Sequence, residues 1–147
     1  MAKSLSLEMV TPEKIALKSQ ASFVVLPAYE GEMGILPGHE PFMVELTAGE
    51  VRVTDGNDVK HYAIAGGFAE ILKDKVSVFA ETAEMASEID AEAARQAMER
   101  AKATAARRDV DPMTLAAAEA ALRWEQAKLR VAALRGRRKP APPHRPE

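Results

Sequence analysis

The chain has 147 residues, of which 47% are hydrophobic and 29% charged, with a formal net charge of −2 and no cysteine. This length suits one domain or a small domain with an appendage, and the lack of cysteine excludes disulfides and thiolate metal sites. No apolar run approaches the length of about 20 residues that a membrane span needs, and residues 1–10 lack the apolar core of a signal peptide, so we expect a bacterial cytoplasmic placement.

Short strand-like segments fill the first half of the chain. Leu5, Leu7 and Met9 alternate with polar residues, which is the period-two pattern of a strand with one buried face. A continuous apolar run at 23–26 is typical of a strand covered on both faces, and Asp-Gly-Asn-Asp at 55–58 indicates a hairpin turn. The alternation recurs at Val51, Val53, Val76, Val78 and Ala80. Because no crossover helices intervene, residues 1–86 are predicted to form an antiparallel β-sandwich.

The second half has the composition of helices. Residues 90–135 hold 16 alanines and no glycine. Asp90 suits the N-cap of a first helix that ends near residue 107 or 108, and Asp111, followed by Pro112, suits the N-cap of a second helix that ends near residue 135, with Gly136 as its stop. We therefore predict an α+β protein in two parts, with a helical hairpin over 87–136 and a disordered, basic, proline-rich tail over 137–147.

Charge divides along the same boundary. Residues 1–89 carry 7 Lys/Arg against 14 Asp/Glu, whereas residues 90–147 carry 13 against 8. The basic half could face nucleic acid, anionic lipid or an acidic protein surface. Alanine faces bury little apolar area, so the hairpin is predicted to be loosely held. Trp124 is expected either to pack on the sandwich or to anchor the helix in a partner groove.

No motif of catalysis or cofactor binding is found. The phosphate-binding G-x-x-x-x-G-K-[ST] pattern is absent, and His39, His61 and His144 have no metal-ligand spacing. No serine lies in a G-x-S-x-G elbow. We predict no catalytic, cofactor or metal site, and hence no enzyme.

Three segments carry a family likeness. GEMGILPGHEP at 31–41 resembles the G-E-x-G-I-x-P-G-H-x-P loop of ATP synthase epsilon subunits. IAGGFAE at 64–70 is similar to that family's S-G-G-x-x-E segment, and VSVFAETA at 76–83 resembles its V-x-V-L-A-x-x-A. The likeness spans about residues 4–135.

The resemblance implies a non-catalytic central-stalk rotor subunit of the proton-translocating F-type ATP synthase. Such a subunit lies peripherally on the cytoplasmic face of the bacterial inner membrane and contacts the membrane only through the complex. Its sandwich binds the gamma subunit and the c-ring. By motif position, the c-ring loop holds Glu32, Met33 and Gly34, the gamma–c region holds His39, and the gamma-facing side holds Gly66 and Gly67.

The resemblance also implies that the hairpin regulates hydrolysis by reaching between the alpha and beta subunits. The cations implied to meet an acidic segment of beta are Arg123, Lys128, Arg130 and Arg135. Some family members bind ATP through an [IL]-D-x-x-R-A motif, but here Ile89-Asp90 is followed by Ala93 at the arginine position. The chain is therefore predicted to bind ATP weakly or not at all.

Two other functions fit parts of the sequence less well. A nucleic-acid adaptor would interleave aromatic residues with the basic ones, yet His144 is the only aromatic residue after Trp124. A small-molecule hydrolase on a β-sandwich would need the catalytic motifs that the sequence lacks. We expect no nucleic-acid partner.

Overall fold

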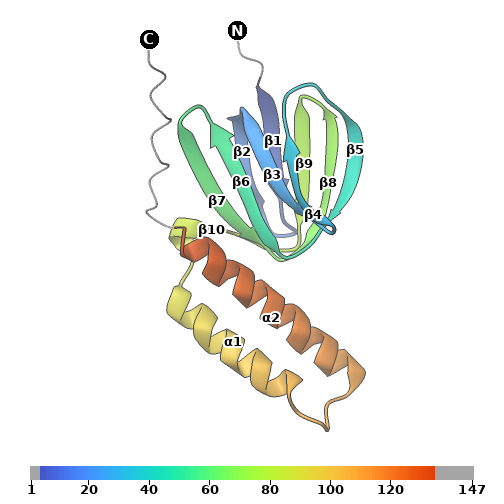
Figure 1. Cartoon of the computed structure of the whole chain (residues 1–147), viewed down its shortest axis with the longest axis vertical. Coiled ribbons are helices and arrows are strands. Elements are labelled where there is room, and N and C mark those ends of the chain that lie inside the picture. Colours follow the sequence, from blue (N-terminus) through green and yellow to red (C-terminus); the bar gives the residue numbers. More distant parts are fainter. Residues whose placement is uncertain (1–3, 135–147) are drawn as a thin grey trace.

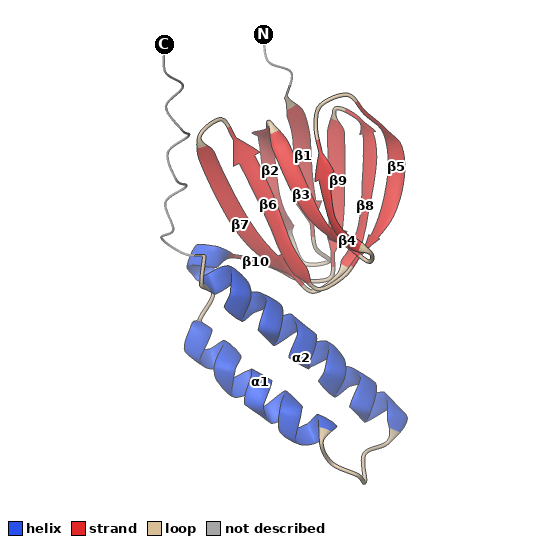
Figure 2. Cartoon of the chain, viewed as in Figure 1, coloured by secondary structure: helices blue, strands red, loops and turns tan. Residues whose placement is uncertain are grey.

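The computed structural model describes residues 4–134. A β-sandwich is followed by two antiparallel helices, and α2 lies between the sandwich and α1 (Figures 1 and 2). The predicted α+β architecture in two parts is confirmed.

Ten strands form the sandwich. They are β1 (Leu5–Val10), β2 (Ile15–Ala21), β3 (Phe23–Ala28), β4 (Gly31–Ile35), β5 (His39–Leu46), β6 (Gly49–Asp55), β7 (Asp58–Ile64), β8 (Gly67–Lys73), β9 (Lys75–Ala80) and β10 (Ala83–Met85). Their order is β10-β7-β6-β3-β5-β8-β9-β1-β2, and β4 pairs with β3 off this path. One pair, β1 with β9, is parallel, contrary to the all-antiparallel expectation. These strands are far apart in the sequence, so no hairpin turn forces them to run in opposite directions.

The main core lies between the two layers of the sandwich. Leu5, Leu7 and Met9 are fully buried, as their alternation predicted, and so are Val76 and Val78 on β9. Each such side chain contributes about 1.5–3 kcal/mol relative to an exposed one. The sandwich therefore has a core that can hold it rigid.

The helices begin at the predicted caps. The Asp90 carboxylate accepts a hydrogen bond from the Ala93 N–H at the start of α1 (Ala91–Ala105). The Asp111 carboxylate accepts one from the Thr114 N–H at the start of α2 (Pro112–Ala132). A single 3₁₀ turn, η1 (Ala86–Glu88), precedes α1.

Helix α1 ends earlier than predicted. The N–H of Arg107 donates to the Thr104 carbonyl three residues back, and the Arg107 guanidinium forms two hydrogen bonds to the Asp109 carboxylate. These contacts turn the chain out of the helix after Ala105. Helix α2 ends at Ala132, and Arg135, Gly136 and the predicted tail lie outside the described residues.

A second, smaller cluster joins the hairpin to the sandwich. It consists of Ala63, Ala86, Ile89 and Val131, with Trp124 and Ala132 packed against it. Of the two alternatives for Trp124, the structure supports packing on the sandwich. In the helices, Ala94, Ala101 and Ala118 are buried, whereas Ala133 is exposed.

Candidate docking surfaces

The β3–β4 hairpin presents Glu32 and Gly34 outward and Met33 inward. The Glu32 carboxylate is exposed and lies 3.5 Å from the Arg52 guanidinium on β6. Met33 packs against the main core, which explains its residue type without a partner. A Cβ atom at Gly34 would lie 3.0 Å from the Phe23 ring, so the ring covers the position that a side chain would occupy.

His39 lies at the other end of β4 from Glu32. Its Nδ1 is 2.7 Å from the Glu40 carbonyl oxygen, and the preceding Gly38 N–H donates to the Asp74 carboxylate at 2.7 Å. From Glu32 to the end of β4 at Ile35 the strand spans about 10 Å, and residues 36–38 follow before His39. The fold therefore keeps His39 and Glu32 apart, although they belong to one sequence motif.

Gly66 and Gly67 are required by the sandwich itself. Both have positive φ, +128° and +145°. A Cβ atom at Gly67 would lie 2.0 Å from the Phe79 carbonyl oxygen, and one at Gly66 would lie 3.4 Å from the Leu46 carbonyl oxygen. The close backbone approach that glycine permits is thus made within this chain, between β8 and β9 and beside the β5–β6 loop.

An exposed row of apolar side chains crosses the outer face of β2, β1, β9 and β8. The Phe68 and Phe79 rings stack with centroids 4.9 Å apart; Phe79 pairs with Val10, and Val10 pairs with Ile15. Ile15, Phe68 and Phe79 are 59%, 46% and 39% exposed. We call Ile15, Val10, Phe79 and Phe68 the apolar row.

Further exposed apolar residues extend this face. Met43 on β5 pairs with Glu70, and Leu72 lies two residues beyond Glu70 on β8, so both project on the same side as Phe68. The sequence reading missed this surface. The available signal was the phenylalanines at outward positions, since Phe68 and Phe79 alternate with the buried Ala69 and Val78.

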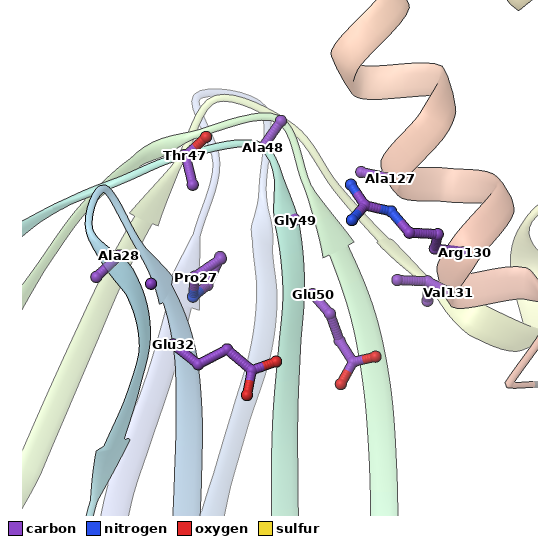
Figure 3. Close-up of a pocket in the computed structure, with 11 residues that line it drawn as sticks. Pro27, Ala28, Glu32, Thr47, Ala48, Gly49, Glu50, Ala127, Arg130 and Val131 are labelled. Atoms are coloured by element: carbon purple, nitrogen blue, oxygen red, sulfur yellow. The ribbon is translucent and has the colours of Figure 1, made fainter.

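A groove of about 320 Å³ separates the sandwich from α2. Figure 3 shows Glu32 and Glu50 on the sandwich side and Arg130 on the helix side. Arg52 lies 3.5 Å from both Glu32 and Glu50. The fold thus brings a predicted c-ring residue, Glu32, and a predicted regulatory cation, Arg130, to one groove. The other lining residues are Pro27, Ala28, Gly31, Thr47, Ala48, Gly49, Ala127 and Val131.

The four cations that the resemblance implies to be regulatory differ in their surroundings. Arg123 and Arg130 are exposed on α2. The Lys128 side chain is only 15% exposed, and its Nζ lies 2.9 Å from Glu125 Oε2 and 3.9 Å from Glu84 Oε1. Its ammonium also lies 5.1 Å from the centroid of the Trp124 ring. Arg135 lies outside the described residues.

The titratable groups with shifted pKa values do not form a reactive site. Burial and the nearby Glu88 carboxylate raise the pKa of Tyr62. Hydrogen bonds from Arg107 lower the pKa of Asp109, and hydrogen bonds from Thr114 lower the pKa of Asp111. Among residues 4–134, no three His, Cys, Asp or Glu side chains are grouped to hold a metal ion. Each pKa shift thus belongs to a core residue or to the loop between the helices.

Comparison with known proteins identifies the family. A model of the ATP synthase delta/epsilon chain β-sandwich domain matches residues 4–86. The ATP synthase epsilon chain of Syntrophobacter fumaroxidans is 44% identical over 132 residues, which cover 90% of this chain and 98% of the relative. The chain belongs to the ATP synthase epsilon chain family. The epsilon chain of Nitratidesulfovibrio vulgaris strain DP4 is 42% identical over 89% of this chain and 97% of its own length.

Solved structures agree with this membership. A chain in the cryo-EM structure of the Euglena gracilis mitochondrial ATP synthase, OSCP/F1/c-ring, superposes with a TM-score of 0.76 at 28% identity and covers 88% of this chain and 81% of that chain. One in the Tetrahymena thermophila central stalk/c-ring structure shares the fold, with a TM-score of 0.53 at 13% identity over 89% of this chain and 95% of that chain. The predicted family is confirmed, and epsilon chains are non-catalytic subunits of ATP synthase. Within the described residues, neither helix of this epsilon-family chain is long and apolar enough to cross a membrane.

Proposed function

We propose that this chain is the central-stalk rotor subunit of a bacterial, proton-translocating F-type ATP synthase. It would lie peripherally on the cytoplasmic face of the inner membrane, with the sandwich (1–86) bound to gamma and the c-ring and the hairpin (87–136) acting on the alpha and beta subunits. Family membership supports the assembly, and the Euglena neighbour comes from a structure that contains F1 and a c-ring. The apolar row is the main structural support for the proposed binding of the sandwich to gamma.

The apolar row is the proposed gamma-binding surface. Stacked, exposed aromatic rings are typical of protein interfaces, where aromatic residues dominate the binding energy. Gly67 lies immediately before Phe68, and His39 begins the strand that carries Met43, which projects on the same side as Phe68. These positions are consistent with gamma contacts along the apolar row.

Binding to purified gamma tests this surface. Phe68→Ser together with Phe79→Ser should weaken the affinity by at least about tenfold, because the loss of such aromatic contacts costs about 2 kcal/mol or more. Met113→Ser is the matched control, since Met113 is 83% exposed but lies at the start of α2. Equal affinity of the double variant and the control would reject the apolar row as the gamma site.

The β3–β4 hairpin is the proposed c-ring contact. Glu32 is exposed near the start of β4, where a polar loop of the c-ring could reach its carboxylate. Glu32→Gln should reduce proton pumping driven by ATP hydrolysis in the reassembled complex. Glu30→Gln, at an exposed position in the turn of the same hairpin, is the control, and equal pumping by the two variants would contradict this role.

The hairpin is the proposed brake on ATP hydrolysis. The exposed cations Arg123 and Arg130 project from α2, where an acidic segment of beta could pair with them; Lys128 and Arg135 complete the proposed set. Truncation after residue 88 should raise hydrolysis by the reassembled complex. Alanine at both Arg123 and Arg130 should raise it partly. Unchanged hydrolysis after truncation would remove the brake from the proposal.

A further inference from the structure

Helix α2 docks over a small residue between two acidic ones. Ala63 on β7 is fully buried and belongs to the cluster that contains Val131. In the sheet, Ala63 pairs with Glu84 on β10 on one side and with Glu50 on β6 on the other. The helix thus rests on a narrow apolar strip with a carboxylate on each flank.

The helix places a cation toward each flank. Lys128 lies 3.9 Å from Glu84, and Arg130 lines the groove that Glu50 also lines (Figure 3). The Lys128 side is the better connected of the two, because its ammonium is also 2.9 Å from Glu125 and 5.1 Å from the Trp124 ring centroid. Charge on the two parts is therefore complementary where they meet.

Apolar packing alone holds this junction weakly. The cluster is made of two alanines, Ile89 and Val131, with Trp124 and Ala132 beside it, and an alanine buries much less apolar area than a leucine. Lys128 is nearly buried and the Glu84 side chain is 35% exposed, so their interaction across the junction is screened less by salt than that of a fully exposed pair. The Lys128–Glu84 ion pair thus adds to what holds the helix in place, whereas the pair with Glu125 lies within α2.

We propose that Lys128 is an electrostatic latch that holds α2 on the sandwich through Glu84. Glu125 positions the ammonium from one helical turn away, and the Trp124 ring covers it. When the pair with Glu84 opens, the hairpin leaves the sandwich and Lys128 becomes available to an acidic partner. The availability of Lys128 to beta rests on the proposed brake, whereas the latch itself does not.

The distance between the two parts measures the latch directly in the full-length chain. Because the chain has no cysteine, spin labels can be placed at Asn57→Cys in the β6–β7 turn and at Met113→Cys on α2, both exposed positions. Glu84→Gln should raise the ratio of undocked to docked chains about tenfold, which lies between the effect of losing an exposed ion pair and that of breaking a buried one. Glu119→Gln, on the exposed side of α2, is the control and should leave the distances unchanged.

Trp124 gives a second readout, because it is the only tryptophan in the chain. Undocking should shift its emission to the red and increase its quenching by acrylamide. Glu84→Gln, Lys128→Gln and the double variant form a cycle in which the two single effects should not add. Additive effects, or distances in Glu84→Gln equal to those of the parent chain, would overturn the latch.

Hydrolysis by the reassembled complex separates the latch from the brake. If Glu84→Gln undocks the hairpin and lowers hydrolysis, both stand. If it undocks the hairpin but hydrolysis is unchanged, the latch stands and the brake fails. If the hairpin stays docked, the latch fails whatever the complex does.

Discussion

The sandwich and the hairpin are held together by different means. The sandwich packs fully buried leucine, isoleucine, valine and methionine side chains between its layers. The hairpin has alanine faces, and it meets the sandwich through a small cluster flanked by the Lys128–Glu84 ion pair. The first part is therefore suited to bind rigidly to other proteins, and the second to come away from it.

Gly67→Ala should have the largest effect, and the effect should fall on the sandwich. The added Cβ would lie 2.0 Å from the Phe79 carbonyl oxygen, at a φ of +145°, so both a clash and backbone strain result. We expect a loss of about 3 kcal/mol or more in the free energy of unfolding, measured by urea denaturation. Gly56→Ala is the control, because φ is +62° there and no atom lies within 4 Å; it should cost about 1–2 kcal/mol. Equal losses would contradict the close-approach argument.

Replacing one buried residue in each part with alanine tests whether the sandwich and the hairpin unfold independently. Leu7→Ala, in the fully buried core, should lower the free energy of unfolding of the sandwich by about 3 kcal/mol. Val131→Ala should cost about 1–2 kcal/mol and act on the hairpin alone. Hydrogen exchange resolved by residue should then show faster exchange in α2 with unchanged exchange in β1 and β9. Faster exchange throughout the sandwich in Val131→Ala would mean that the parts unfold as one.

Acid should weaken the start of α2 in the hairpin. Hydrogen bonds from Thr114 lower the pKa of Asp111 from its ordinary 3.8, so the folded form favours the carboxylate. This stabilisation is present above the ordinary pKa and is lost as the pH falls through the lowered one. Helix content followed by circular dichroism should therefore decline as the pH is lowered below about 4. Asp111→Asn keeps a cap that does not titrate and should flatten the decline; an identical decline in that variant would exclude Asp111 as its cause.

Added ATP should have the smallest effect on the hairpin. Ala93 occupies the position of the arginine in the ATP-binding motif, and its N–H is held by the Asp90 cap. Calorimetric titration of the full-length chain with ATP should give no measurable heat. Micromolar affinity would contradict this and would mean that a ligand, besides the ion pairs, holds the hairpin.

Local patterns in the sequence were sufficient to predict the strands, the helices and the boundary between the sandwich and the hairpin. Alternation placed Leu5, Leu7 and Met9 on one buried face, and Asp90 and Asp111 capped the helices as predicted. These features depend on contacts between residues that are close in the chain, and for that reason they can be read without a structure. The motif at 31–41 likewise identified the family.

The surfaces were decided by tertiary structure. The apolar row exists because β1 pairs with the distant β9 in one register, which aligns Val10 with Phe79. The Lys128–Glu84 pair and the groove shared by Glu32 and Arg130 depend on where α2 crosses β6 and β7. The sequence predicts that Lys128 and Arg130 lie on the second helix, but no local pattern predicts which carboxylate of the sandwich each one faces. That choice depends on the packing of elements far apart in the chain, which the sequence specifies only through the whole fold.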